Sequence, residues 1–424
     1  MNQYQIKLLG QIQTVSFLAF ILFDFFSISL THIFGFLGIG AWLIQTHLTR
    51  TWNQVRLPLI LPFSLFCLAN LLALSTSLNP GRDFLELKRL LEIMVFFWVV
   101  NSLGKTHPGE LFATWFSSIK NHRAGPYLER WTRKLKSVST RDLYLYGLMF
   151  AGSLASILGL FQAASSGVSL ATRISGTLSI YITYAGLLIM TGIMTVSYLL
   201  NSVGTKRWAA LALGLMVISL LFSLSRGAWL GFSVGVLFLV LIRKPIIILA
   251  LPLLAVLLYF VSPQAVQVRF QSLVNFQDVT FQNRLDMWRL GWQIFERYPI
   301  TGCGFNCLKT LAPDYPEHQK ILGHVHNNLL QIAINTGLIG VLTWVYIWIN
   351  YFLYIAKEYQ MQANHKGRWV ILGSAGGVLA FQTSGLFECN FIDSEVVLLC
   401  YFIMALPWVY GKSNWSSKRA IGGV

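Results

Sequence analysis

Long apolar runs, separated by short polar segments, dominate the chain. Twelve runs have about the 20 predominantly apolar residues that a bilayer-crossing helix needs. They cover residues 11–30, 32–48, 57–77, 85–103, 143–165, 179–200, 208–224, 227–242, 245–262, 328–355, 369–388 and 394–410. The pattern therefore predicts an all-α polytopic membrane protein with about 12 transmembrane helices.

The positions of lysine and arginine predict the orientation of these helices. If the chain starts on the cytoplasmic side, the inner segments hold 21 of the 32 basic residues, in keeping with the positive-inside rule. An even number of crossings then places both termini in the cytoplasm. The first run carries Asp24 and lacks a small-residue cleavage site, so we expect it to be a retained span and not a signal peptide.

The composition agrees with a membrane protein and excludes an ordinary soluble domain. Hydrophobic residues make up 55% of the chain and charged residues only 11%, whereas about a quarter of the residues in soluble domains are charged. The formal net charge of +16 mainly reflects the basic inner segments. We therefore expect membrane lipids, and no nucleic acid, among the partners.

Two connecting segments are longer than the others. Between the fourth and fifth runs, "KTHPGELFATWFSSIKNHRAGPYLERWTRKLKS" places apolar residues at helical spacing among basic ones, which predicts an amphipathic helix on the inner leaflet. The segment at about 263–327 is the only sizeable one on the outer side, and its stretch "NRLDMWRLGWQIFERYP" predicts a helix along the membrane surface, ended by "YPITGCGFN". We accordingly divide the chain into residues 1–142, with four spans and the basic loop, and residues 143–424, with the outer loop.

An arginine interrupts the apolar stretch from Trp208 to Ile242. The motif "SLSRGAWLG" predicts a tight hairpin on the outer side with Arg226 in it. A charge in this place is costly unless it has a partner, and a planar guanidinium can bind two phosphate oxygens at once. The alternative is an interfacial arginine that reaches the lipid headgroups.

Three further arginines on the outer side are candidates for the same anion site. Arg284 and Arg289 lie on the predicted surface helix and would join Arg226 if that helix folds back over the hairpin. Alternatively, nearby acidic residues such as Asp286 neutralise them locally. Arg173, in "TRISGTLS", is a weaker candidate because a flexible loop tolerates an arginine.

The stretch "GHVHNNLLQIAINTGLIG" starts the tenth apolar run with two histidines and two asparagines. Residues two positions apart at a helix start do not share a face, so we expect only one of His324 and His326 to point into a membrane-side cavity. A histidine there suits a general base that acts on a sugar hydroxyl. The alternative is a helix cap or a headgroup contact, and Asn327 and Asn328 are themselves candidate cap residues.

Acidic residues and cysteines add further candidates. The motif "GLFECNFIDSEV" places Glu388, Asp393 and Glu395 near one membrane face, where they would position acceptor hydroxyls or orient the arginines, or else form a solvated turn. Cys303 and Cys307 lie in the outer loop. Their spacing is awkward for a disulfide on a helix, although a turn could join them.

A metal site is a further option on the outer side. It would combine His318, His324 and His326 with Asp314 or Glu317. Neither an HExxH motif nor a paired-carboxylate spacing supports it. We therefore expect no metal.

Four stretches together resemble the O-antigen ligase and polymerase superfamily of bacterial envelope glycosyltransferases. They are "SLSRGAWLG", "RLDMWRLGWQIFERYPITGCGFN", "HNNLLQIAINTGLIG" and "GLFECNFIDSEV". The most specific element is the family pattern of His, then Asn, Ser or Gln, nine residues, Gly, two residues, and Gly, Thr or Tyr. His326, Asn327, Gly337 and Gly340 meet this pattern, and the similarity covers about residues 140–410.

The resemblance implies twelve helices with one large periplasmic loop in the bacterial inner membrane. It also implies transfer of a glycan from an undecaprenyl diphosphate-linked donor to a lipid or glycan acceptor on the periplasmic side, with no metal, nucleotide or other cofactor. By this resemblance His326 is the catalytic base, and Arg226 with one or both of Arg284 and Arg289 binds the diphosphate. The remaining candidates named above would support the site or the acceptor.

Two other functions stay open at this point. A polymerase, which extends the glycan on its lipid carrier, shares the donor, the arginines and the fold with a ligase, so the sequence does not separate them. A transporter of bicarbonate or another small solute belongs to a different class. It should show repeats and broken helices with polar groups near the midplane, whereas the polar residues of this chain gather at the outer face.

Overall fold

The computed structural model describes residues 3–106, 140–201, 206–273, 275, 277–311, 323–362 and 365–411. Every regular element in these ranges is a helix, which confirms the all-α fold. Most of the segment predicted as an amphipathic inner-leaflet helix, residues 107–139, lies outside the described residues, and so does the tail from residue 412.

Helices stand at all twelve predicted runs. Within the described ranges, six are long and apolar enough to cross a membrane: α1 (Gln3–Phe23), α2 (Ile28–Leu48), α8 (Thr140–Ser166), α9 (Tyr181–Asn201), α11 (Arg226–Arg243) and α16 (Asn328–Met361). The other runs hold α3 (Ile60–Ala73), α5 (Ile93–Ser102), α10 (Arg207–Phe222), α12 (Leu251–Val261), α17 (His365–Ser384) and α18 (Ser394–Tyr410). The chain is thus a multi-pass membrane protein, and the count of about 12 crossings stays a prediction.

The fourth predicted run is not one continuous α-helix. It begins inside α4 (Pro80–Glu86), continues as a 3-10 helix over Leu87–Glu92, and only then becomes α5. Charged residues occupy this irregular part, where Arg89 pairs with Glu86 at 2.7 Å and also donates to the Ile392 carbonyl. The apolar pattern predicted the position of the run, but it did not predict this ion pair and this hydrogen bond of Arg89.

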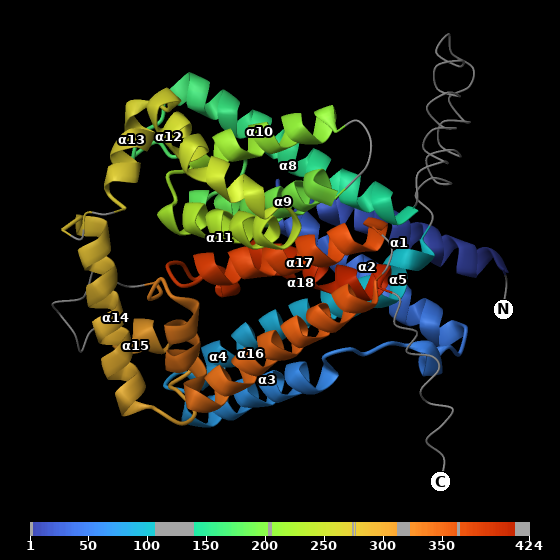
Figure 1. Ribbon diagram of the computed structural model, residues 1–424. Coiled ribbons are helices and arrows are strands. Elements are labelled where there is room, and N and C mark those ends of the chain that lie inside the picture. Colours follow the sequence, from blue (N-terminus) through green and yellow to red (C-terminus); the bar gives the residue numbers. More distant parts are fainter. Residues whose placement is uncertain are drawn as a thin grey trace.

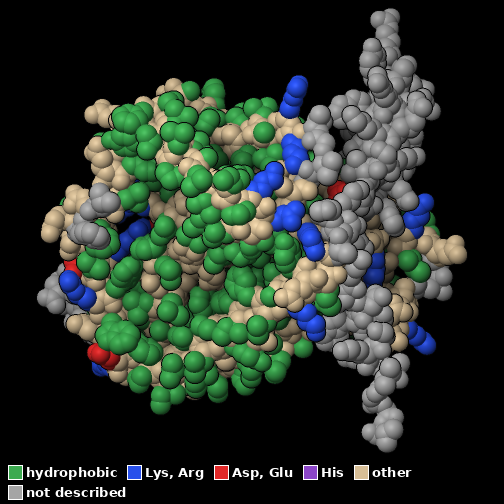
Figure 2. Space-filling view, in the orientation of Figure 1, with side chains coloured by type: hydrophobic (Ala, Val, Ile, Leu, Met, Phe, Trp, Pro, Cys, Tyr) green, Lys and Arg blue, Asp and Glu red, His purple; other side chains and the backbone are tan. Residues whose placement is uncertain are grey.

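The described part of the loop that was predicted at about 263–327 contains three helices, namely α13 (Gln264–Gln271), α14 (Val279–Arg297) and α15 (Cys307–Leu311). Asp278 caps α14 by accepting from the Phe281 backbone N–H at 3.1 Å, and α14 ends before "YPITGCGFN", as predicted. Figure 1 shows α14 lying across one end of the helix bundle, which we call the loop end. α1 begins at the opposite, terminal end, toward which basic side chains gather in Figure 2.

Close packing between α11 and α17 brings two candidate segments together. A Cβ at Gly231 would lie only 2.5 Å from the Ala380 carbonyl oxygen, so the backbones touch there, as small residues allow in membrane helices. Nearer the loop end, a Cβ at Gly227 would lie 3.4 Å from Cγ of Glu388. The hairpin that carries Arg226 therefore contacts the turn that carries Glu388.

α16 is broken at Gly337, whose φ of 63° and ψ of −164° are not helical. Residues 299–304 fill the break and bond to the backbone groups that the helix leaves free. The hydrogen bonds are Cys303 N to Ile334 O (3.0 Å), Gly304 N to Asn335 O (3.1 Å), Leu338 N to Pro299 O (2.8 Å) and Ile339 N to Ile300 O (3.2 Å). Because lipid cannot satisfy free peptide groups, a broken membrane helix needs such partners.

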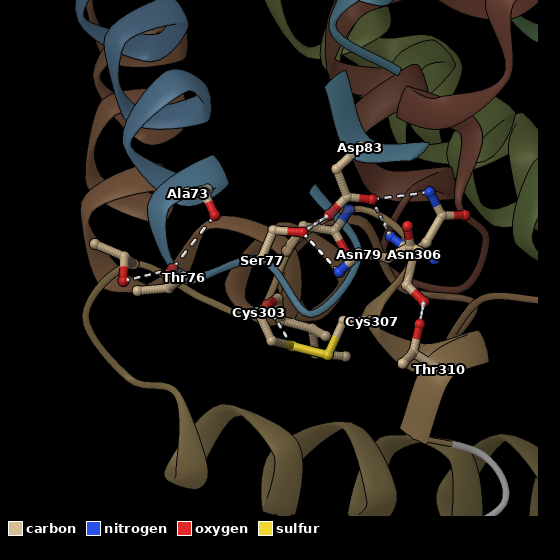
Figure 3. The surroundings of a disulfide bond; sticks show 12 residues. Ala73, Thr76, Ser77, Asn79, Asp83, Cys303, Asn306, Cys307 and Thr310 are labelled. Carbon is tan, nitrogen blue, oxygen red and sulfur yellow. Dashed lines mark hydrogen bonds between the residues drawn. A yellow bond between two sulfur atoms is a disulfide. The ribbon is translucent and has the colours of Figure 1, made fainter. Parts of the chain in front are cut away.

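A disulfide joins Cys303 and Cys307, whose Cα atoms are 5.4 Å apart, so a turn does connect the two cysteines. Figure 3 shows this bridge next to the segment that follows α3. There Asp83 accepts from the backbone and side-chain nitrogens of Asn306 (3.0 and 2.8 Å) and from Ser77 Oγ (2.6 Å). The disulfide and the hydrogen bonds between Asn306 and Asp83 therefore hold the segment that fills the α16 break at the loop end.

Candidate functional site

A buried carboxylate at the loop end joins two of the predicted functional residues. Glu388 lies in the turn between α17 and α18, and its side chain is 3% exposed. Its Oε1 accepts from Nη2 of Arg284 on α14 at 2.5 Å, and its Oε2 lies 3.0 Å from Nδ1 of His326. Three segments that are distant in sequence thus meet at one side chain.

Glu388 stays ionised despite its burial. Burial alone would raise the pKa of this carboxyl group, but the hydrogen bond with His326 and the positive charge of Arg284 outweigh it, so the pKa lies below its usual value. An ionised carboxylate only accepts hydrogen bonds. The Nδ1 atom of His326 must therefore carry the proton that is shared with Glu388.

The backbone conformation at His326 leaves its imidazole ring out of the cap of α16. His326 has a φ of 50°, a left-handed conformation that non-glycine residues seldom adopt. The next residue, Asn327, is the N-cap of α16 and accepts from the Leu330 N–H at 3.0 Å, as predicted. The side chain of His326 caps no helix among the described residues. Trp288 of α14 donates to the Val325 carbonyl at 3.0 Å and so holds the segment before α16 in place.

The expectation that His324 and His326 point in different directions is wrong. Their rings are in edge-to-face contact, with centroids 4.2 Å apart. The expectation assumed helical geometry, but residues 323–327 precede α16 and are not helical. Burial, together with the charge of His326, lowers the pKa of His324 to about 4, so His324 is neutral at pH 7.

This shift makes the stability of the protein depend on pH. In the unfolded chain His324 takes up a proton near its ordinary pKa of 6.5, whereas in the folded state it does so only near 4. Between these values the unfolded state binds more protons, so the free energy of unfolding should fall by up to about 3 kcal/mol as the pH drops through this window. Thermal unfolding of the solubilised protein at pH 7 and pH 4.5 should show a smaller acid loss for His324→Asn than for the wild type. Equal losses would contradict the shift.

Arg226 opens α11 and is 9% exposed. Its Nη1 donates to the Ser272 carbonyl at 2.8 Å, and its Nη2 donates to Asp278 at 3.1 Å and to Thr280 at 2.7 Å. Burial would raise the pKa of Asp278, but the hydrogen bond from Thr280 and the charge of Arg226 together lower it. The helix α14 is thus tied back to the hairpin, as the anion-site hypothesis required.

The sequence analysis missed one buried arginine of the loop, Arg269. It lies on α13, is 5% exposed, and donates from Nε to the Leu224 carbonyl at 3.1 Å. Burial, then the charges of Arg226 and Arg173, lower its pKa to about 10, so it remains charged. Arg269 shares one helix face with Val266, which the structure shows to be fully buried, but the sequence alone does not show that this face is covered.

Other predicted residues lie elsewhere. Arg289 is 68% exposed and pairs with Asp286 at 2.8 Å, so the structure does not bring it to Glu388. Asp393 accepts from Thr183 at 2.5 Å, and its pKa is raised to about 7 by burial and by its neighbour Glu395. Of the optional metal ligands, residues 314, 317 and 318 lie outside the described residues.

Basic side chains and an apolar groove flank the site. Figure 2 shows blue basic side chains at the bottom of a hollow at the loop end. Between α16 and α17, a groove of about 540 Å³ is lined by Val345, Phe352 and Gln382, and a second one of about 290 Å³ shares Val345 and Gln382 and reaches Asn328 and Gly385. The apolar surface therefore runs along the outside of α16 and α17 to Asn328, two residues after His326.

Two comparisons with known proteins agree with the family resemblance seen in the sequence. A family model described as O-Antigen ligase matches residues 211–345, a range that includes Arg226, Arg284 and His326. Over 238 residues the chain is 28% identical to a protein of Rickettsia felis named "Putative polysaccharide ligase", and this match covers 51% of the chain and 55% of the relative. The chain thus spans about half the length of this curated relative.

Proposed function

We propose that this chain, which is similar to the O-antigen ligases over residues 211–345, transfers a glycan from an undecaprenyl diphosphate-linked donor to a hydroxyl group of an acceptor. The observation that carries the proposal is the connection from Arg284 through Glu388 to His326. It joins a cation for a departing phosphate to a base for an incoming hydroxyl. We place the loop end in the periplasm and both termini in the cytoplasm, since basic residues gather toward the terminal end.

His326 acts as the general base in this proposal. With Nδ1 protonated and bonded to Glu388, the free lone pair of the neutral ring is on Nε2. The acceptor oxygen attacks the anomeric carbon of the donor, and its proton passes to Nε2. The bond between that carbon and the phosphate oxygen breaks, and its electron pair leaves with the lipid diphosphate.

The arginines stabilise the charge that develops on the leaving diphosphate. A guanidinium fork binds two phosphate oxygens, and it acts more strongly in a site that excludes water. We assign this role to Arg226 and Arg284 and leave out the exposed Arg289. The donor already carries an activated leaving group, so the step needs no nucleotide, and the isoprenoid tail would lie in the groove between α16 and α17.

The proposal is tested with purified protein, an undecaprenyl diphosphate-linked oligosaccharide, separate candidate acceptors and EDTA. Glycan transfer to a foreign acceptor supports a ligase, and extension of the donor glycan indicates a polymerase. No consumption of the donor with any acceptor would contradict both. Isotope uptake by vesicles that contain the protein would then test transport.

Replacement of Glu388 by glutamine should lower kcat on the order of a hundredfold, with a smaller change in the KM for the donor. The neutral amide keeps the shape of the side chain, but it no longer fixes the proton on Nδ1 of His326 or balances the charge of Arg284. Initial rates at varied donor concentration measure both constants. The matched control is Glu296→Gln, since Glu296 is exposed on α14 and accepts only from Trp292 among the described residues. An unchanged kcat for Glu388→Gln would remove this residue from the mechanism.

A further inference from the structure

Two of the four arginines around the hairpin have no carboxylate partner. Arg226 pairs with Asp278 at 3.1 Å and Arg284 pairs with Glu388 at 2.5 Å. Neither Arg269 nor Arg173 forms an ion pair with any residue that the structure describes. The two arginines assigned from the family resemblance are therefore paired directly, whereas Asp278 acts on Arg269 only through a longer-range electrostatic attraction.

Arg269 is held in place in a way that leaves its charged end available. Its Nε donates to the Leu224 carbonyl in the hairpin at 3.1 Å. In return, Arg226 of the hairpin donates to the Ser272 carbonyl, three residues after Arg269, at 2.8 Å. These two bonds lock the hairpin and the end of α13 together. The two terminal nitrogens of Arg269 make no hydrogen bond within the described ranges, and they keep some contact with solvent although the residue as a whole is only 5% exposed.

Arg173 presents a similar free cation from the loop between α8 and α9. Its guanidinium lies over the ring of Tyr181, with Cζ 4.4 Å from the ring centroid. Its Nε is buried without a hydrogen-bond partner in the described part of the chain. The charge of Arg173 contributes, after burial and after Arg226, to the lowered pKa of Arg269, so the two guanidinium groups lie within electrostatic range of each other.

A guanidinium whose terminal N–H groups have no protein acceptor gains charge-assisted hydrogen bonds when an anionic ligand binds. Each phosphate of a glycosyl lipid diphosphate carries one negative charge, so the donor offers two negative charges for two unpaired arginines. Each planar guanidinium can bind two oxygens. A single phosphate group would engage only part of this arrangement.

We propose that Arg269 and Arg173 join Arg226 and Arg284 in holding the diphosphate and supply the additional contacts that select it over a monophosphate. This inference rests on the proposed function. Arg226 and Arg284 also position the site, because Arg226 fixes α14 against the hairpin and Arg284 fixes Glu388 beside His326.

The test measures binding of inorganic pyrophosphate and of orthophosphate to the purified full chain in lipid nanodiscs. We expect Arg269→Gln and Arg173→Gln each to weaken pyrophosphate binding at least tenfold, with a smaller effect on orthophosphate, and Arg269→Lys to retain part of the affinity. The matched control is Arg297→Gln, because Arg297 also lies over a neighbouring tyrosine, Tyr298, but is exposed. It should bind pyrophosphate like the wild type.

Arg269→Gln could unfold the protein because it loses the hydrogen bond to Leu224. Arg173→Gln removes no hydrogen bond to a described residue, so its pyrophosphate affinity tests the inference even in that case. Wild-type pyrophosphate affinity in a folded Arg173→Gln and a folded Arg269→Lys would overturn the inference. If glycan transfer occurs but these variants bind pyrophosphate normally, the inference fails and the proposed function stands. If the variants lose pyrophosphate binding but the wild type transfers no glycan, the proposed function fails and the anion site stands.

Discussion

The His326→Ala variant should transfer glycan about 10² to 10⁴ times more slowly than the wild type, the range typical for loss of a general base. Alanine removes the only group in the described site that combines a free ring nitrogen with a carboxylate partner, at 3.0 Å from Glu388. Because His326 does not bind phosphate in this mechanism, pyrophosphate binding should persist. Single-turnover transfer with a labelled donor measures the rate.

The control for this variant is His47→Ala, since His47 is an exposed histidine near the end of α2, far along the chain from the site. It should transfer glycan at the wild-type rate. If His326→Ala kept more than about a tenth of the wild-type rate while folded, the base assignment would be wrong. Another group, or water, would then have to accept the proton.

The Gly337→Ala variant should lose about 3 kcal/mol or more of stability. The backbone at Gly337 has a φ of 63°, and an added Cβ would lie 2.2 Å from the Ile300 carbonyl oxygen. A methyl group would therefore strain the backbone and push residues 299–304 out of the α16 break, which would leave peptide groups unsatisfied. Thermal unfolding of the purified protein, together with glycan transfer by the folded fraction, measures the effect.

Gly214→Ala is the matched control, because nothing lies within 4 Å of a Cβ added there on α10. Alanine should be neutral or slightly stabilising at that position, since it favours helix more than glycine does. Equal unfolding temperatures for the two glycine variants would show that the break tolerates a side chain. The packing of residues 299–304 would then not explain the glycine at this position of the family pattern.

The apolar pattern was sufficient to place the helices. All twelve runs contain helix, "SLSRGAWLG" forms the hairpin between α10 and α11, and the surface helix ends where "YPITGCGFN" begins. These features depend on local hydrophobic spacing and on residues that start or stop helices, which a sequence displays directly. The division at residue 142 stays a prediction.

The contacts between distant segments could not be predicted in the same way. Glu388 was a candidate for orienting the arginines, but the sequence did not indicate which arginine. The proximity of Arg284 and His326 to it appears only when α14 and the α17–α18 turn fold over the start of α16. Arg269 went unnoticed because its helix is short and is buried only by contact with a hairpin that lies about 45 residues earlier in the chain. The contact between His324 and His326 depends on one left-handed residue, which no spacing rule indicates.

The tie between Asp83 and Asn306 has a consequence for how the chain is inserted into the membrane. Asp83 is fully buried, and the residue that gives it two of its three hydrogen bonds follows 223 positions later. During synthesis the segment around Asp83 is threaded early and has only Ser77 as a partner until Asn306 arrives. The second loop on this side of the membrane thus reaches its final form only after about three quarters of the protein has been made, so a ribosome stalled before residue 306 would display an early loop that proteases can still reach.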